Sequence, residues 1–297
     1  MMNKAGRSGS AFLLPIVAVV VVSMLSACGD ADTDGARDNG GNRAAYTRPD
    51  SFPMVDHKLA EMFLLMQEKR DSIAFDFSDT FALTLEAVLK EPWSATFPFD
   101  SLRAAGVRIT ESDDHRVRIY WWLHPWTGTM LHFPNIMQRR VDSGECLTVY
   151  SERDNEEGVM ATLAYDGLYH LYDNIYLAHA GGRLWSSAPY EVFYDFHFGE
   201  DGYGESDVEF RVGDSVYSSI WVDKHTYLHG DTLEKYDRTV PTVMSFDSVE
   251  HILSYPEVVY VEDGEPFNNV LATDEIRPSG RVIRLKFNGR HFEEEQP

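Results

Sequence analysis

The spacing of hydrophobic and polar residues changes twice along the chain. An almost purely apolar run covers residues 11–25 and has no polar face. It is shorter than the roughly 20 residues that a membrane-spanning helix needs, and its length is typical of the hydrophobic region of a secretory signal peptide. Helical spacing follows from residue 54, and short strand-like runs separated by Gly, Asp and Asn begin at residue 106. The pattern predicts a mainly β (α+β) protein in which two N-terminal helices precede the strands.

The helical part occupies residues 51–105. Apolar residues recur on one side of the segment 54–70, namely Val55, Leu59, Met62, Phe63 and Met66, and predict an amphipathic helix. A second helix is expected to begin near Asp79 and to end before Pro92, because a proline disfavours helical backbone in the residue before it. We interpret both apolar stripes as core packing rather than as a groove for a partner.

Residues 106–297 predict a β-rich domain. Strict alternation in 116–123 places Val117, Ile119, Trp121 and Leu123 on one face, and Arg116, Arg118, Tyr120 and Trp122 on the other. Further strands are expected at 107–110, 130–133, 147–150, 159–163, 175–179, 192–198, 208–212, 216–222, 258–262 and 282–287. The clearest turns are 180–183 and Asn288-Gly289. An antiparallel sandwich, an open barrel and a few-bladed propeller-like domain all fit this spacing.

The end of the apolar run carries a recognisable motif. Lys4 and Arg7 precede the run, residues 1–27 contain no acidic residue, and the run ends in Leu25-Ser26-Ala27-Cys28. This ending resembles the lipobox of bacterial lipoproteins. The resemblance implies a signal peptide at residues 1–27, cleavage before Cys28 by signal peptidase II, and lipidation of Cys28 with a diacylglycerol and a further acyl group such as palmitate. The alternative is an uncleaved anchor or an ordinary secretory signal with a chance cysteine.

Two further stretches carry a second resemblance. Residues 112–133, with the turn Thr127-Gly128-Thr129 and the following residues 135–138, form the first stretch, and the ending 281–292, which closes on Phe287-Asn288-Gly289-Arg290-His291-Phe292, forms the second. Together they are similar to uncharacterised lipoproteins of the Bacteroidota. This resemblance implies a location at the outer membrane of the cell envelope, facing the periplasm or the cell surface. It implies no activity.

Residues 28–50 predict a flexible acidic tether. The stretch 29–42 has no bulky apolar residue and is rich in Gly, Asp and Asn. Asp30, Asp32 and Asp34 match the first half of an EF-hand calcium loop, but Gly41 stands where that loop needs a bidentate Glu. The tether interpretation is therefore favoured.

Charge and cysteine usage limit the partners. The formal net charge is −22, and removal of Lys4 and Arg7 with residues 1–27 changes it to −24. Such a chain repels phosphate backbones, so nucleic acid is not expected as a partner, whereas the membrane is expected as one through the lipid anchor. No cofactor is indicated. Cys146 has no intrachain partner if Cys28 carries lipid, and we expect a buried structural thiol.

The candidate ligand sites are weak. Trp122 faces away from the apolar stripe and Trp126 follows the His124-Pro125 turn, so either indole could stack on a sugar ring. The loop 199–207, with Glu200, Asp201, Glu205 and Asp207, fits a calcium site less well than a solvated turn. His225 and His229 lie in a strand-like context, where their spacing does not predict a metal site.

These observations favour a binding or structural role in the cell envelope, with a glycan or a protein as the partner. A glycan-binding or glycan-hydrolysing surface lipoprotein is the alternative. No catalytic residue can be named, because the chain has no Gly-x-Ser-x-Gly motif or phosphate loop and no pair of acidic residues stands out.

The tether interpretation makes a prediction about stability. Deletion of residues 29–42 should leave the melting temperature unchanged, because a solvated tether contributes no packing. Differential scanning calorimetry of the full chain and the deletion variant would check this. A large drop in melting temperature would show that the stretch packs against the folded part.

Overall fold

The computed structural model describes residues 51–68, 73–125, 131–150, 163–183, 189–199, 202–223, 243–260 and 276–295. The chain divides into two compact units, one formed by residues 1–107 and 140–148 and the other by residues 108–139 and 149–297. Strand β4 (Cys146–Tyr150) runs from the first into the second. Among the described residues, no helix is long and apolar enough to cross a membrane.

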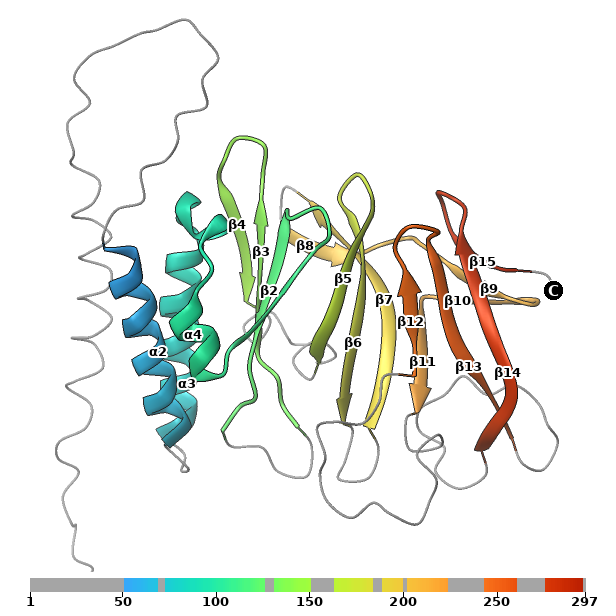
Figure 1. The fold of residues 1–297 in the computed structure, drawn as a ribbon, viewed down its shortest axis with the longest axis horizontal. Coiled ribbons are helices and arrows are strands. Elements are labelled where there is room, and N and C mark those ends of the chain that lie inside the picture. Colours follow the sequence, from blue (N-terminus) through green and yellow to red (C-terminus); the bar gives the residue numbers. More distant parts are fainter. Residues whose placement is uncertain are drawn as a thin grey trace, which may run out of the picture. The chain divides into compact units, whose positions relative to one another are not determined.

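The first unit contains the helices (Figure 1). They are α2 (Phe52–Glu68), α3 (Ile73–Leu89), the 3₁₀ helix η1 (Pro92–Thr96) and α4 (Asp100–Ala105). The predicted apolar stripe of α2 is confirmed, since all five of its members are buried. Helix α3 begins at Ile73 rather than near Asp79, and the sequence reasoning missed α4.

Asp56 of α2 holds the beginning of α4. Its side chain is only 3% exposed, and its carboxylate accepts hydrogen bonds from the backbone N–H groups of Ser101 (2.8 Å) and Leu102 (3.0 Å). The first N–H groups of a helix have no partner within the helix, and a carboxylate there also complements the helix dipole. Phe99, the residue before α4, offers no side-chain cap, so α2 supplies it.

The second unit is built from three groups of strands. Strands β1 (Arg108–Glu111), β2 (Val117–Trp121) and β3 (Asn135–Arg140) pair antiparallel in chain order. A five-stranded sheet has the order β11-β7-β6-β5, with β8 paired to β7. It contains β5 (Ala164–Tyr172), β6 (Ile175–Arg183), β7 (Pro189–Gly199), β8 (Gly202–Glu205) and β11 (Ser219–Asp223).

The third group is a six-stranded sheet with the order β10-β9-β15-β14-β13-β12. Its strands are β9 (Phe210–Val212), β10 (Ser215–Tyr217), β12 (Ser245–Asp247), β13 (Ile252–Tyr260), β14 (Ile276–Phe287) and β15 (Phe292–Glu294). Every pair in it is antiparallel except β9 with β15, which are parallel. The fold class is therefore confirmed as mainly β with N-terminal helices.

The five-stranded sheet is covered on both faces. On one face, Leu177 and Phe193 pack with Phe210, Leu253 and Leu285 of the six-stranded sheet in one hydrophobic core. On the other face, a second core contains Ala178, Val192 and Phe196 together with Val117 and Ile119 of β2. Figure 1 shows this sheet between the strands β2 and β3 and the strands β13 and β14.

Three expectations for the strands are wrong. Residues 180–183 are not a turn but the end of β6, paired with β7. A Cβ on Gly181 would lie 3.0 Å from the carbonyl oxygen of Tyr190, so the glycine allows a close approach between strands. Residues 131–133 belong to no strand. The expected strand 216–222 is split at Ser218 into β10 and β11, which belong to different sheets.

The Asp56 cap makes a prediction. Asp56→Ala should lower the free energy of unfolding by about 2 kcal/mol, because two backbone N–H groups lose a buried carboxylate. Asp79→Ala, which removes an exposed carboxylate from α3, is the matched control and should change it by less than about 0.5 kcal/mol. Urea unfolding followed by the helical circular dichroism signal measures both values, and equal losses would contradict the capping role.

Candidate binding pocket

A parallel strand pair brings two distant segments together in the second unit. Phe292 of β15 is opposite Phe210 of β9, and the two buried rings stack at 4.9 Å with an interplanar angle of 4°. The backbone N–H of Phe292 donates to the carbonyl of Glu209 (2.8 Å). Residues 290–291 are thereby fixed next to the segment 206–211.

The hairpin of β9 and β10 is held against the same strand pair. Val212 and Ser215 are paired, so Gly213 and Asp214 form the turn, and Gly213 has a φ of 56° that favours glycine. The N–H of Gly213 donates to the carboxylate of Glu294, 81 residues away in the sequence (3.1 Å). This hydrogen bond ties the hairpin to β15.

The turn between β14 and β15 follows the predicted Asn-Gly motif, which is confirmed. Gly289 has a φ of 92°, and the side-chain oxygen of Asn288 accepts hydrogen bonds from the N–H groups of Arg290 and His291, each at 3.1 Å. Phe287 and Phe292 on either side are buried. The two phenylalanines of the C-terminal ending therefore anchor a turn on which Arg290 is exposed. His291 is mostly buried, and its Nε2 lies 2.9 Å from Nδ2 of Asn288.

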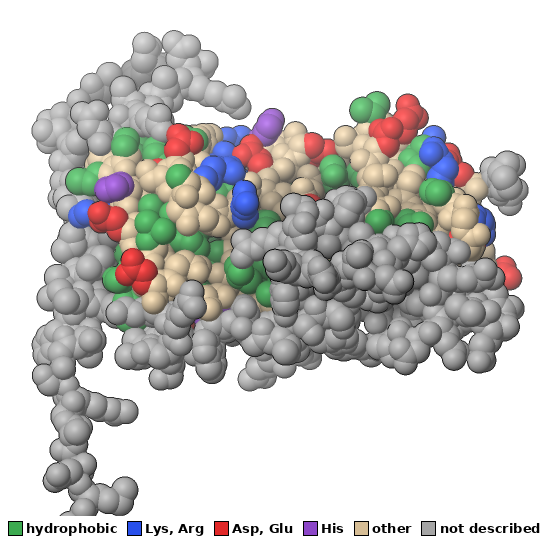
Figure 2. All heavy atoms as spheres, turned by 60° about the horizontal axis from the view of Figure 1, so that its bottom comes forward, with side chains coloured by type: hydrophobic (Ala, Val, Ile, Leu, Met, Phe, Trp, Pro, Cys, Tyr) green, Lys and Arg blue, Asp and Glu red, His purple; other side chains and the backbone are tan. Residues whose placement is uncertain are grey.

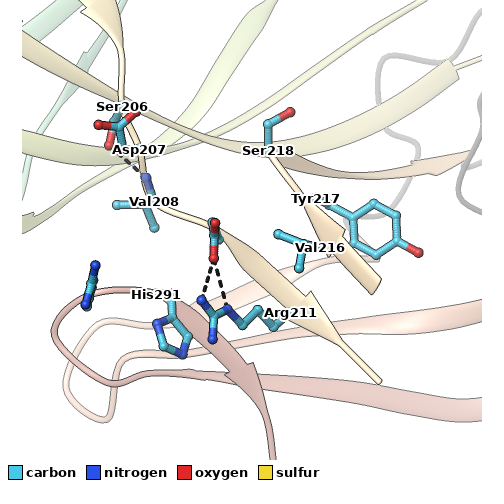
Figure 3. Close-up of a pocket in the computed structure, with 10 residues that line it drawn as sticks. Ser206, Asp207, Val208, Arg211, Val216, Tyr217, Ser218 and His291 are labelled. Carbon is cyan, nitrogen blue, oxygen red and sulfur yellow. Dashed lines mark hydrogen bonds and ion pairs between the residues drawn. The ribbon is translucent and has the colours of Figure 1, made fainter. Parts of the chain in front are cut away.

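These elements enclose a hollow of about 500 Å³ that opens to solvent (Figure 3). We call it the β9–β15 pocket. Most of its lining side chains are polar: they are Ser206, Asp207, Val208, Glu209, Arg211, Val216, Tyr217, Ser218, Arg290 and His291. Volumes of this size are typical of small-ligand sites in proteins.

One ion pair within the pocket is already made. Arg211 donates through Nε (3.0 Å) and Nη2 (2.6 Å) to Oε2 of Glu209, as the dashed lines in Figure 3 show. The hydrogen bonds and charge of Arg211 lower the pKa of Glu209 below its usual range. Glu209 is therefore held in its ionised form.

Three other polar groups in the pocket are not engaged in hydrogen bonds or ion pairs within the described part of the chain. The guanidinium of Arg290, the carboxylate of Asp207 and the hydroxyl of Ser218 make no hydrogen bond or ion pair with any described residue. All three residues are exposed. They supply both donors and acceptors for a polar ligand.

Asp195 lies behind the pocket on β7. Its side chain is 6% exposed, and burial raises the pKa of its carboxyl to about 6. Hydrogen bonding with Ser206 and with the backbone of Val208 partly offsets this effect. Asp195 thus supports the segment that lines the pocket without entering it.

A second buried polar group has a structural explanation. Glu191 of β7 is fully buried, and its Oε2 accepts hydrogen bonds from the N–H groups of Val243 (3.0 Å) and Met244 (2.8 Å). His179 of β6 lies 3.7 Å from the same oxygen and stacks on Phe193. The group holds the segment before β12 against the five-stranded sheet.

The expectation that Trp122 presents an exposed indole is wrong. The side chain of Trp122 has no exposed surface, so it does not present an open indole to a sugar. Alternation does not separate a buried from an exposed face here, because Tyr120 and Trp122 are buried as completely as Val117 and Ile119. Trp126 lies outside the described residues.

Several other predictions can also be placed. Cys28, His225, His229, Glu200 and Asp201 lie outside the described residues. Cys146 is buried, as expected. Within the described ranges, no group of three or more His, Cys, Asp or Glu side chains could hold a metal ion, and Asp207 of the acidic loop lines the β9–β15 pocket instead.

The described residues on the face shown in Figure 2 form no single strongly charged patch. There, acidic and basic side chains of the described residues are interspersed in small groups. This arrangement agrees with the scattered acidic residues of the sequence.

Comparison of the chain with protein-family models, with curated proteins and with solved structures found no match. The residues of the pocket therefore have to be interpreted from their own chemistry. The sequence did not predict the pocket, because its lining comes from segments that are far apart in the chain.

The raised pKa of Asp195 predicts a dependence of stability on pH. The native state binds the proton of Asp195 more tightly than the unfolded state does, whose pKa is near 3.8. The stabilisation by protonated Asp195 is therefore fully present below pH 3.8 and is lost as the pH rises through about 6. Asp195 should thus cost about 1 kcal/mol of stability between pH 5 and pH 7.5.

Urea unfolding of the wild type and of Asp195→Asn at both pH values measures this contribution, because the asparagine does not titrate. Asp214→Asn, in the exposed β9–β10 turn, is the matched control. An equal loss of stability in the wild type and in Asp195→Asn over this range would contradict the assignment.

Proposed function

We propose that the chain is a lipid-anchored protein of the cell envelope that binds a ligand in the β9–β15 pocket. The observation that carries the binding role is the open hollow of about 500 Å³ in which Arg290 and Asp207 keep unused hydrogen-bonding groups. The lipobox-like Leu25-Ser26-Ala27-Cys28 supports the anchor. Two or three acyl chains on Cys28 would hold the protein stably at the outer membrane, on its periplasmic or external face.

Binding fits the pocket better than hydrolysis. Among the described residues that line it, Asp207 and Glu209 are the only carboxylates, and a glycoside hydrolase needs one carboxyl group that stays protonated until it acts as the general acid. Arg211 has the opposite effect on Glu209, because it lowers the pKa of this carboxyl. A glycan-hydrolysing enzyme therefore remains the weaker of the two proposals.

The anchor makes a prediction that uses both cysteines of the chain. Cys28→Ala should abolish incorporation of labelled palmitate and leave an unacylated protein that is soluble or retains its signal peptide. Cys146→Ala is the matched control and should keep the label, because Cys146 is a buried thiol. Metabolic labelling followed by immunoprecipitation measures both. Label that persists in Cys28→Ala would contradict lipidation at this residue.

A further inference from the structure

The formal charges of the described residues that line the β9–β15 pocket balance one another. The positive charges of Arg211 and Arg290 equal the negative charges of Asp207 and Glu209, in a chain whose formal net charge is −22. A site for a strongly anionic ligand would carry an excess of cations, and a site for a cation would carry an excess of carboxylates. The balance favours a ligand without net charge.

The hydrogen-bonding groups of the pocket are of both kinds. Arg290 offers only donors and Asp207 only acceptors, while the Ser218 hydroxyl offers both. A ligand that satisfies all three has to donate and accept at several closely spaced positions. The hydroxyl groups of a sugar do this, because each one is both a donor and an acceptor.

An apolar surface lies at the edge of the same pocket. Val216 of β10 lines it and is 57% exposed, which is high for a large aliphatic side chain in a described strand. Tyr217 lines it as well, and Figure 3 shows both residues on the β10 side. Contact of the C–H face of a sugar ring with such a surface is favourable, because it removes apolar area from water.

We infer that the β9–β15 pocket binds the end of an uncharged oligosaccharide. Arg290 donates to sugar oxygens, Asp207 accepts from sugar hydroxyls, and Val216 contacts the apolar face of a ring. Asp195 positions the segment 206–208 from behind. This inference rests on the binding role proposed above and specifies the ligand class.

The test uses the full-length acylated protein in a detergent that has no sugar head group. Isothermal titration calorimetry with cellotetraose, xylotetraose and chitotetraose provides the neutral probes, and tetragalacturonate provides the acidic one. We expect at least one neutral tetrasaccharide to bind with a dissociation constant below about 1 mM.

Matched variants locate the site. Arg290→Gln and Asp207→Asn should each weaken binding roughly tenfold, because each removes a charged hydrogen-bonding partner of the sugar. The controls are Lys286→Gln on β14 and Asp214→Asn in the β9–β10 turn, which make the same changes of charge at exposed positions outside the pocket. They should stay within roughly twofold of the wild type. Thermal unfolding of each variant verifies that it is folded.

Three results would overturn the inference: no binding of any neutral tetrasaccharide at about 10 mM, binding of tetragalacturonate alone, or neutral-sugar binding that both pocket variants leave unchanged. Palmitate labelling of the same preparations reports on the anchor separately. Binding of tetragalacturonate alone, if weakened in Arg290→Gln, would keep the proposed binding role while excluding the neutral sugar.

Discussion

The burial of the five-stranded sheet on both faces is the constraint on which the second unit depends. Its central strand β7 sends Phe193 into one hydrophobic core and Val192 and Phe196 into the other. Burial of apolar surface stabilises the folded state by about 25 cal/mol per Å². A strand that buries both faces therefore contributes more than an edge strand with one solvent-exposed face. This explains why residues on both faces of β7 are buried, including the polar Glu191 and Asp195.

Polar groups inside this arrangement are tolerated because they hold the connecting segments. Glu191 accepts two backbone hydrogen bonds from residues 243–244, and Arg139 donates to the carbonyl of Phe198 (3.1 Å) and to the side chain of Asn174. A buried charge without such partners would cost several kcal/mol. Each of these two buried side chains therefore fixes the position of a connecting segment relative to a sheet.

Local patterns predicted the parts of the fold that depend on local chemistry. Helical spacing identified α2, and the Asn-Gly pair identified the β14–β15 turn, since both follow from backbone preferences within a few residues. Alternation failed at β2, where both faces are covered. The turn expected at 180–183 was wrong, because Gly181 instead allows a close approach to Tyr190 across the ladder. The pocket could not be predicted, because the pairing of Phe210 with Phe292 leaves no local mark in the sequence.

The pairing of β9 with β15 also has a consequence for biosynthesis. Gly213 and Glu294 are joined across 81 residues, and the segments that line the pocket leave the ribosome at well separated times. Phe210 is synthesised first and lacks its stacking partner until Phe292 has been synthesised. Such non-local pairing slows folding and exposes apolar surface to aggregation. In an exported chain, the same delay would keep β9 unpaired with β15 during passage through a translocation channel.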